Sequence, residues 1–151
     1  MAKKEKKEIR IRNRKATFEY AIEQEFVAGL VLTGAEVKSL RDGKATISEA
    51  YCYLTNTGIR IKGMHIAEFK NAGYVEQEPL RERELLLTTV ELRKLRNKMK
   101  DQGYTIVPME LFFSDTGFAK LRIGLGRGKK NYDKRQDIKS RDVKREMERY
   151  T

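Results

Sequence analysis

The sequence contains few of the residue types that commonly build disulfides, metal sites and catalytic sites. Its 151 residues include one cysteine, one histidine, two prolines and no tryptophan. The single cysteine, Cys52, excludes an internal disulfide framework and a zinc site built from several cysteines. No apolar run approaches the roughly 20 residues of a membrane-spanning helix, and no apolar stretch follows the basic N-terminus as it would in a secretory signal. We therefore expect a cytoplasmic protein with no metal, no cofactor and no membrane association.

Positive charge is abundant, and it is concentrated at the two ends of the chain. The formal net charge is +11, from 33 Lys and Arg against 22 Asp and Glu. Residues 1–15 carry a net charge of +6 and residues 127–151 a net charge of +5, whereas residues 16–126 are neutral. This pattern predicts a basic N-terminal arm, a central domain and a basic C-terminal tail with these boundaries. Such arms neutralise nucleic-acid phosphates, although the same charge can also serve solubility.

The central segment is predicted to be mostly strand. Residues 17–32 alternate apolar and polar side chains in the period of two that marks a half-buried strand. Gly29 within them suggests a bulge, and Pro108 indicates an edge or a bulge in a later strand. Turn residues at 56–58 and 114–117 each join two apolar runs and predict hairpins. The predicted strands are 17–32, 51–54, 59–64, 66–69, 104–113 and 118–125.

Two short helices are predicted between these strands. Residues 33–36 and 88–91 both fit the S/T-x-x-E pattern of a helix-opening capping box. Gly43 and Gly103 follow at positions where a glycine commonly ends a helix. About six strands with two short helices in 111 residues indicate a mainly β fold. We predict a small antiparallel β-barrel of the oligonucleotide-binding type with flanking short helices.

The C-terminal tail has too few apolar residues to fold alone. In a helix, Val143, Met147 and Tyr150 would share one side, with Arg141, Arg145 and Arg149 on the opposite side. That apolar stripe is too narrow to order a helix in water. We predict a tail that is disordered in the free protein and helical when bound to an anionic partner.

The sequence offers little for catalysis. Cys52 and His65 are the sole candidate nucleophile and base, and a buried structural thiol is the ordinary explanation for a cysteine in a strand. Residues 124–130 are rich in glycine and lysine but fail the spacing of both the P-loop and the dinucleotide-binding loop. We interpret them as a flexible joint before the tail, where Arg127, Lys129 and Lys130 could contact RNA.

Several blocks of this sequence resemble one family. Residues 34–44 (Gly-Ala-Glu-Val-Lys-Ser-Leu-Arg-Asp-Gly-Lys) and 128–135 (Gly-Lys-Lys-Asn-Tyr-Asp-Lys-Arg) are specific, and residues 13–16, 79–81 and 103–108 occur with them in the same order. From about residue 13 to its end, the chain is similar to the SsrA-binding protein (SmpB) family. The resemblance implies an oligonucleotide-binding-type barrel and a tail that is unstructured in the free protein.

The resemblance also implies a function without catalysis. Proteins of this family bind, as monomers on the RNA, the tRNA-like domain of transfer-messenger RNA. They deliver it to stalled ribosomes in trans-translation. The barrel takes the place of the missing anticodon arm, and the tail enters the decoding site of 16S rRNA and the empty mRNA channel. Two alternatives stay open: a general barrel-type translation factor, and a small hydrolase that uses Cys52 and His65.

Carried over residue by residue, the resemblance predicts two sets of contact residues. The RNA-binding set is Asn13, Lys15, Lys38, Ser39, Arg41 and Lys44, to which the charge pattern adds Arg127, Lys129 and Lys130. The decoding-site set in the tail is Tyr132, Asp133, Lys134, Arg135, Ile138, Arg141, Arg145 and Met147, with Tyr132 placed to stack on a base. One departure concerns Val27, since the family pattern has an acidic residue there.

Overall fold

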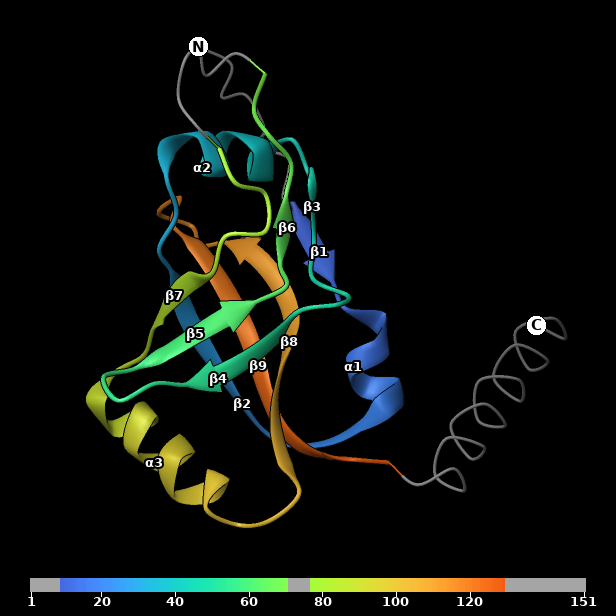
Figure 1. Cartoon of the computed structure of the whole chain (residues 1–151), viewed down its shortest axis with the longest axis vertical. Coiled ribbons are helices and arrows are strands. Elements are labelled where there is room, and N and C mark those ends of the chain that lie inside the picture. Colours follow the sequence, from blue (N-terminus) through green and yellow to red (C-terminus); the bar gives the residue numbers. More distant parts are fainter. Residues whose placement is uncertain (1–8, 71–76, 130–151) are drawn as a thin grey trace, which may run out of the picture.

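The computed structural model of the chain describes residues 9–70 and 77–129. Within them lie three helices and nine strands, arranged as a barrel with flanking helices (Figure 1). The helices are α1 (Arg14–Glu19), α2 (Gly34–Arg41) and α3 (Thr89–Met99). The strands are β1 (Arg10–Arg12), β2 (Tyr20–Leu30), β3 (Ala45–Thr46), β4 (Tyr51–Leu54), β5 (Ile59–Lys62), β6 (His65–Ile66), β7 (Arg83–Leu86), β8 (Tyr104–Phe113) and β9 (Ala119–Gly128).

Six of the strands form a closed ring. Antiparallel neighbours follow the order β8, β4, β5, β7, β2 and β9, and β9 pairs with β8 to complete the circle. β1 pairs with β8 beside the contact between β4 and β8. Closure leaves no open sheet edge within the ring. The predicted mainly β barrel is therefore confirmed.

The core fills the ring and continues under two helices. Ile61, Leu111 and Leu121 are fully buried inside it. Leu40 of α2 and Leu95 of α3 join the same core, and Figure 1 shows these two helices at opposite ends of the barrel. Both predicted capping boxes are present, since each threonine side chain accepts from the glutamate amide and each glutamate side chain accepts from the threonine amide. These caps fix where α2 and α3 begin.

The structure corrects two of the predicted strands. Residues 17–19 belong to α1 rather than to the strand, which begins at Tyr20. Ala16 is buried and Asn13 bonds to β8, so packing against β8 overrides the alternating pattern in this short segment. Residues 66–69 do not extend the first hairpin. Instead, Ile66 pairs with Ala45 in a separate two-stranded sheet of β3 and β6.

Three glycines have structural roles that differ from those predicted from the sequence. The ladder of β2 and β9 shifts register between Ile22 and Gln24, whereas Gly29 pairs regularly with β9. Gly124 and Gly126 lie inside β9 and are paired on both sides, so they form no flexible joint. The prediction for Pro108 is confirmed, because β8 shifts register between Pro108 and Glu110.

Gly126 is expected to tolerate no side chain. A Cβ atom built there would lie 2.3 Å from the carbonyl oxygen of Ala21, whereas one built at Gly128 in the same strand would meet nothing within 4 Å. Gly126→Ala should therefore force β2 and β9 apart and lower the free energy of unfolding by about 1–3 kcal/mol. Gly128→Ala should change it by less than about 1 kcal/mol. Urea unfolding of both variants checks this, and equal stabilities would contradict it.

The ordered fold extends beyond the predicted domain boundaries at both ends. β1 and the start of α1 lie within the expected N-terminal arm, residues 1–15. β9 continues to Gly128, and the amide of Lys129 donates to the carbonyl of Glu19. The basic charge of residues 10–15 and 127–129 is thus attached to the barrel itself. The rest of the tail, residues 130–151, lies outside the described residues.

Candidate nucleic-acid interface

The outer face of α2 carries basic side chains. The capping box at Thr33 sets the register of the helix, and this register buries Leu40 and leaves Lys38 and Arg41 exposed. Lys44 follows Gly43, whose positive φ of 73° ends the helix.

No carboxylate among the described residues forms an ion pair with these three lysine and arginine side chains. Cations on an ordered element that have no acidic partner can neutralise phosphates without first breaking a salt bridge.

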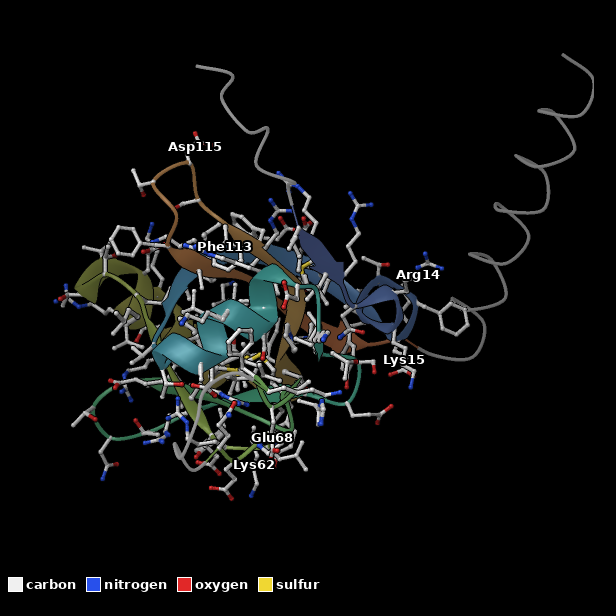
Figure 2. All side chains as sticks on the ribbon, turned by 90° about the horizontal axis from the view of Figure 1, so that it is seen from above. Arg14, Lys15, Lys62, Glu68, Phe113 and Asp115 are labelled. Carbon is white, nitrogen blue, oxygen red and sulfur yellow. The ribbon has the colours of Figure 1, made fainter. Side chains whose placement is uncertain are left out.

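Two aromatic rings lie beside these cations. Lys38 Nζ is 5.5 Å from the centroid of Phe69, and the guanidinium carbon of Arg41 is 5.7 Å from that of Phe113. Phe113 ends β8, next to the hairpin that carries Asp115, and Figure 2 shows both from above at one side of α2. Cation–π contacts of this length hold the side chains over the rings at an exposed surface. Charged groups interleaved with aromatic rings are typical of surfaces that bind nucleic acid.

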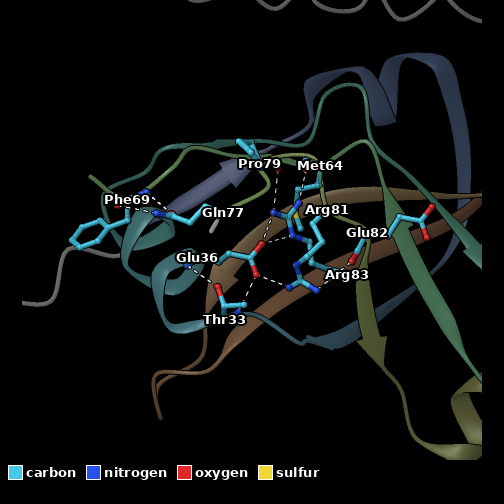
Figure 3. Close-up of polar contacts among 9 residues, drawn as sticks. All are labelled: Thr33, Glu36, Met64, Phe69, Gln77, Pro79, Arg81, Glu82 and Arg83. Carbon is cyan, nitrogen blue, oxygen red and sulfur yellow. Dashed lines mark hydrogen bonds and ion pairs between the residues drawn. The ribbon is translucent and has the colours of Figure 1, made fainter. Parts of the chain in front are cut away.

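An ion cluster around the buried side chain of Arg83 anchors α2 to β7 and to the segment before it (Figure 3). Glu36 Oε1 accepts from Arg81 at 2.6 Å, and Glu36 Oε2 accepts from Arg83 Nε at 2.7 Å. Arg83 is fully buried, and it also donates to the carbonyl oxygens of Met64 and Pro79 at 2.6 and 3.1 Å. The cluster thereby joins α2, β7 and the segments around residues 64 and 79. The sequence predicted Glu36 as a helix cap, but it did not predict the ion pairs of Glu36 with Arg81 and Arg83.

The surroundings of Glu36 lower the pKa of its carboxyl group. Burial by itself would raise the pKa of Glu36, but hydrogen bonds from Arg81, the amide of Thr33 and Arg83 hold it below its ordinary value. Glu36 therefore stays ionised and balances the buried guanidinium. The sequence does carry one signal for Arg83: it precedes Leu85 by two positions in a strand, so both side chains face inward.

The backbone of Phe69, whose ring lies beside Lys38, is held by two hydrogen bonds. Gln77 Oε1 accepts from the amide of Phe69 at 2.7 Å, and Gln77 Nε2 donates to the carbonyl of Phe69 at 3.0 Å (Figure 3). These two bonds join Phe69 to Gln77, and residues 71–76 between them lie outside the described residues. The surface around α2 thus rests on fixed backbone at Phe69 and on the Glu36 cluster.

Other predicted RNA-binding residues lie away from α2. Lys15 in α1 pairs with Glu49 at 2.8 Å, and this hydrogen bond raises the pKa of the lysine. Arg127 is exposed at the end of β9, with its guanidinium carbon 4.4 Å from the ring centroid of Tyr104. Lys129 Nζ donates to the carbonyl of Thr17 at 2.8 Å. The predicted set is therefore divided between α2 and the region where α1 meets the end of β9.

Two of the predicted contact residues are buried. Ser39 is 1% exposed, so its hydroxyl faces the interior. Asn13 is 9% exposed, and its Nδ2 donates to the carbonyl of Pro108. The burial of Ser39 follows from the packing of α2, and that of Asn13 from the corner between β1 and α1; a motif match reveals neither. Val27 lies on the outer face of β2 and is 46% exposed, so it does not contribute to the core.

The decoding-site residues predicted in the tail all lie beyond Lys129. Lys130 and the whole set Tyr132, Asp133, Lys134, Arg135, Ile138, Arg141, Arg145 and Met147 lie outside the described residues. Their predicted roles stay predictions.

The hydrolase alternative conflicts with the position of its nucleophile. Cys52 is buried in β4, and burial raises the pKa of its thiol far above neutrality, so the reactive thiolate is suppressed. In the described part of the chain, no three His, Cys, Asp or Glu side chains gather as a metal site would require. None of the helices within residues 9–70 and 77–129 has the length and apolar character needed to cross a membrane.

Comparison with known proteins gives one consistent result. The model of the SmpB protein family matches residues 10–151. The SsrA-binding protein of Phocaeicola vulgatus is 47% identical over 141 residues, which are 93% of this chain and 94% of that protein. The SsrA-binding protein of Wolbachia pipientis wMel is 49% identical over 142 residues, 94% of this chain and 95% of that protein.

A solved structure agrees with the sequence comparisons. A chain of "tmRNA-SmpB: a journey to the center of the bacterial ribosome" is similar with a TM-score of 0.67 and 37% sequence identity. The match covers 81% of this chain and 85% of that one. The predicted family is confirmed: the barrel with its capped helices and basic face belongs to a member of the SmpB family.

Proposed function

We propose that this protein binds the tRNA-like domain of transfer-messenger RNA and brings it to stalled ribosomes for trans-translation. The observation that carries the proposal is the set of cations at Lys38, Arg41 and Lys44, which lie on and beside an ordered helix and have no acidic partner among the described residues. The family membership and the names of the relatives support the choice of RNA. The protein acts through binding and has no catalytic role in this proposal.

Basic side chains on an ordered helix should bind RNA more tightly than the same side chains on a flexible segment. Side chains on α2 lose less conformational freedom on binding than the same residues on a mobile segment would lose. The neighbouring Phe69 and Phe113 restrict Lys38 and Arg41 further. We therefore assign the main RNA affinity to the barrel and α2, with one protein molecule on each RNA.

The basic tail has a separate role in the proposal. Residues 130–151 enter the decoding site and the mRNA channel, where the arginines at positions 141, 145 and 149 meet rRNA phosphates along one side of a helix formed on binding. The arginines recur every four residues, so in a helix they would share the side opposite Val143, Met147 and Tyr150, and this spacing supports the assignment. A message that already fills the channel would exclude the tail, so ribosomes without downstream mRNA are preferred.

A truncation after Lys130 tests this division of roles. The truncated protein should bind the isolated tRNA-like domain within about tenfold of the full chain, or ~1.4 kcal/mol, because α2 and the barrel are intact. It should fail to support tagging on stalled ribosomes. Gel-shift titrations against the tRNA-like domain and an ordinary tRNA, followed by an in vitro tagging assay, measure both effects.

Two outcomes would contradict the proposal. A loss of roughly a thousandfold in RNA affinity on truncation would move the main site into the tail. Equal affinity of the full chain for ordinary tRNA would favour a general translation factor.

A further inference from the structure

The two aromatic rings beside the cations of α2 have differently supported backbones. Phe113, beside Arg41, belongs to β8 and pairs with Ala119 of β9 in a continuous ladder. Phe69, beside Lys38, lies after the end of β6, where the chain forms neither helix nor strand. The sheet therefore places the backbone of Phe113, whereas the backbone of Phe69 needs another support.

The side chain of Gln77 supplies that support (Figure 3). Its Oε1 accepts from the amide of Phe69 at 2.7 Å, and its Nε2 donates to the carbonyl of Phe69 at 3.0 Å. Among the described residues, no backbone group bonds to that amide or that carbonyl. A glutamine amide carries both an acceptor and donors, so one side chain can satisfy both groups as a neighbouring strand would. We call this pair of bonds the Gln77 clasp.

The clasp joins two segments that are each attached to α2 by other contacts. The amide of Ala67, two residues before Phe69, donates at 2.9 Å to the carbonyl of Lys44, just after the helix ends. On the other segment, Arg81 pairs at 2.6 Å with Glu36 in the first turn of the helix. The clasp therefore fixes the position of Phe69 relative to α2 and not only relative to its own segment.

A ring held in this position can orient Lys38. Its ammonium nitrogen lies 5.5 Å from the centroid of Phe69. The electron-rich face of the ring attracts the ammonium, while the N–H groups that point away from the ring stay available to a phosphate oxygen. Lysine has a long and flexible side chain, so one that is already restricted loses less freedom when it binds. The support of Phe69 should therefore affect the RNA affinity of the α2 face.

We propose that Gln77 is a positioning residue for RNA binding: it holds Phe69 where the ring directs Lys38 toward a phosphate of the RNA. Gln77 itself touches no RNA. The inference rests on the proposed function for its ligand, the tRNA-like domain. It adds a residue that lies outside the sequence blocks shared with the family and outside both capping boxes.

The variant Gln77→Ala removes the clasp and leaves every cation in place. Its affinity for the tRNA-like domain should fall about three- to tenfold, the range expected for ordering one long side chain on binding. The slope of log affinity against log salt should stay within about 0.3 of the wild type, because no phosphate contact is lost, whereas Lys38→Gln should lower it by roughly 0.7–0.9. Gel-shift titrations at several salt concentrations measure both quantities.

Two further variants serve as controls for Gln77→Ala. Gln77→Met keeps the length of the side chain without its amide and should lose affinity to the same extent. Gln102→Ala removes an exposed glutamine just beyond α3, at the other end of the barrel from α2, and should change affinity less than about twofold.

Double-mutant cycles separate positioning from a general effect on the fold. In the Lys38→Gln background, Gln77→Ala should cost less than about twofold, because the side chain that it positions is gone. In the Arg41→Gln background it should keep its full cost, because the ring beside Arg41 is carried by β8. Phe69→Leu removes the ring and should cost about as much as Gln77→Ala, with no further loss when the two are combined.

The outcomes that contradict the proposal are distinct from those that contradict the proposed function. If Gln77→Ala costs the same in the Lys38→Gln and Arg41→Gln backgrounds, Gln77 acts through the fold in general or contacts RNA directly, and the positioning role is wrong. Unchanged affinity of both Gln77→Ala and Gln77→Met would also overturn it. Failure of the wild-type chain to bind the tRNA-like domain would instead overturn the proposed function.

Discussion

Glu36→Gln should lower the free energy of unfolding by about 3 kcal/mol. Glutamine keeps the shape of the side chain and can preserve the capping box with Thr33, because the motif accepts either residue. It removes the negative charge that balances Arg83, which is fully buried. Removing one partner of a buried ion pair typically costs 3–5 kcal/mol, because the other charge is left without compensation. Urea unfolding at neutral pH measures the loss.

The second capping box of the chain supplies the control. Glu91 caps α3 through Thr88 in the same way as Glu36 caps α2, but it forms no ion pair among the described residues. Glu91→Gln should therefore change stability by less than about 0.5 kcal/mol. Equal losses at Glu36 and Glu91 would show that the cap alone, and not the buried charge pair, explains the effect.

The stabilisation by Glu36 should also depend on pH. Its pKa is lowered in the folded protein, so its contribution is complete above the ordinary carboxyl pKa near 4.3 and is lost as the pH falls through the folded value. The stability difference between wild type and Glu36→Gln should consequently shrink below about pH 4. A difference that stays constant from pH 7 to pH 3 would contradict the role of the charge.

The triple variant Lys38→Gln/Arg41→Gln/Lys44→Gln should lower affinity for the tRNA-like domain by about two orders of magnitude at 0.1 M salt. Each phosphate contact contributes roughly 0.7–0.9 to the slope of log affinity against log salt. Losing three contacts should therefore reduce that slope by about 2–3. Glutamine retains helix propensity, so α2 should stay folded. Titrations at several salt concentrations measure both quantities.

A triple variant of α3 distinguishes a specific face from net charge. Arg93→Gln/Lys94→Gln/Lys98→Gln removes three exposed cations from a helix with the same type of cap. Its slope should stay within about one unit of the wild type, since α3 lies at the opposite end of the barrel in Figure 1. Equal losses in the two variants would mean that RNA responds to the total charge and that α2 is no specific interface.

The sequence by itself determined the features that depend on neighbours along the chain. Two S/T-x-x-E patterns predicted the starts of α2 and α3, and the turn residues at 56–58 and 114–117 predicted both hairpins. Capping boxes and turns are satisfied within a few residues, so their signals are complete in the local sequence. The exposed positions of Lys38 and Arg41 followed from the helical period and the burial of Leu40.

Only the tertiary structure decided what depends on residues far apart in sequence. Arg83 is neutralised by Glu36, 47 positions away, and Asn13 bonds to Pro108, 95 positions away; no local pattern encodes such pairs. Residues 17–19 alternate like a strand but form a helix, because packing against β8 outweighs a weak local preference. Gly126 is required by a strand that passes within van der Waals distance of it, not by a flexible joint. Arg12, Arg14 and Arg122 likewise line one groove only because the β1–α1 corner packs beside β8 and β9.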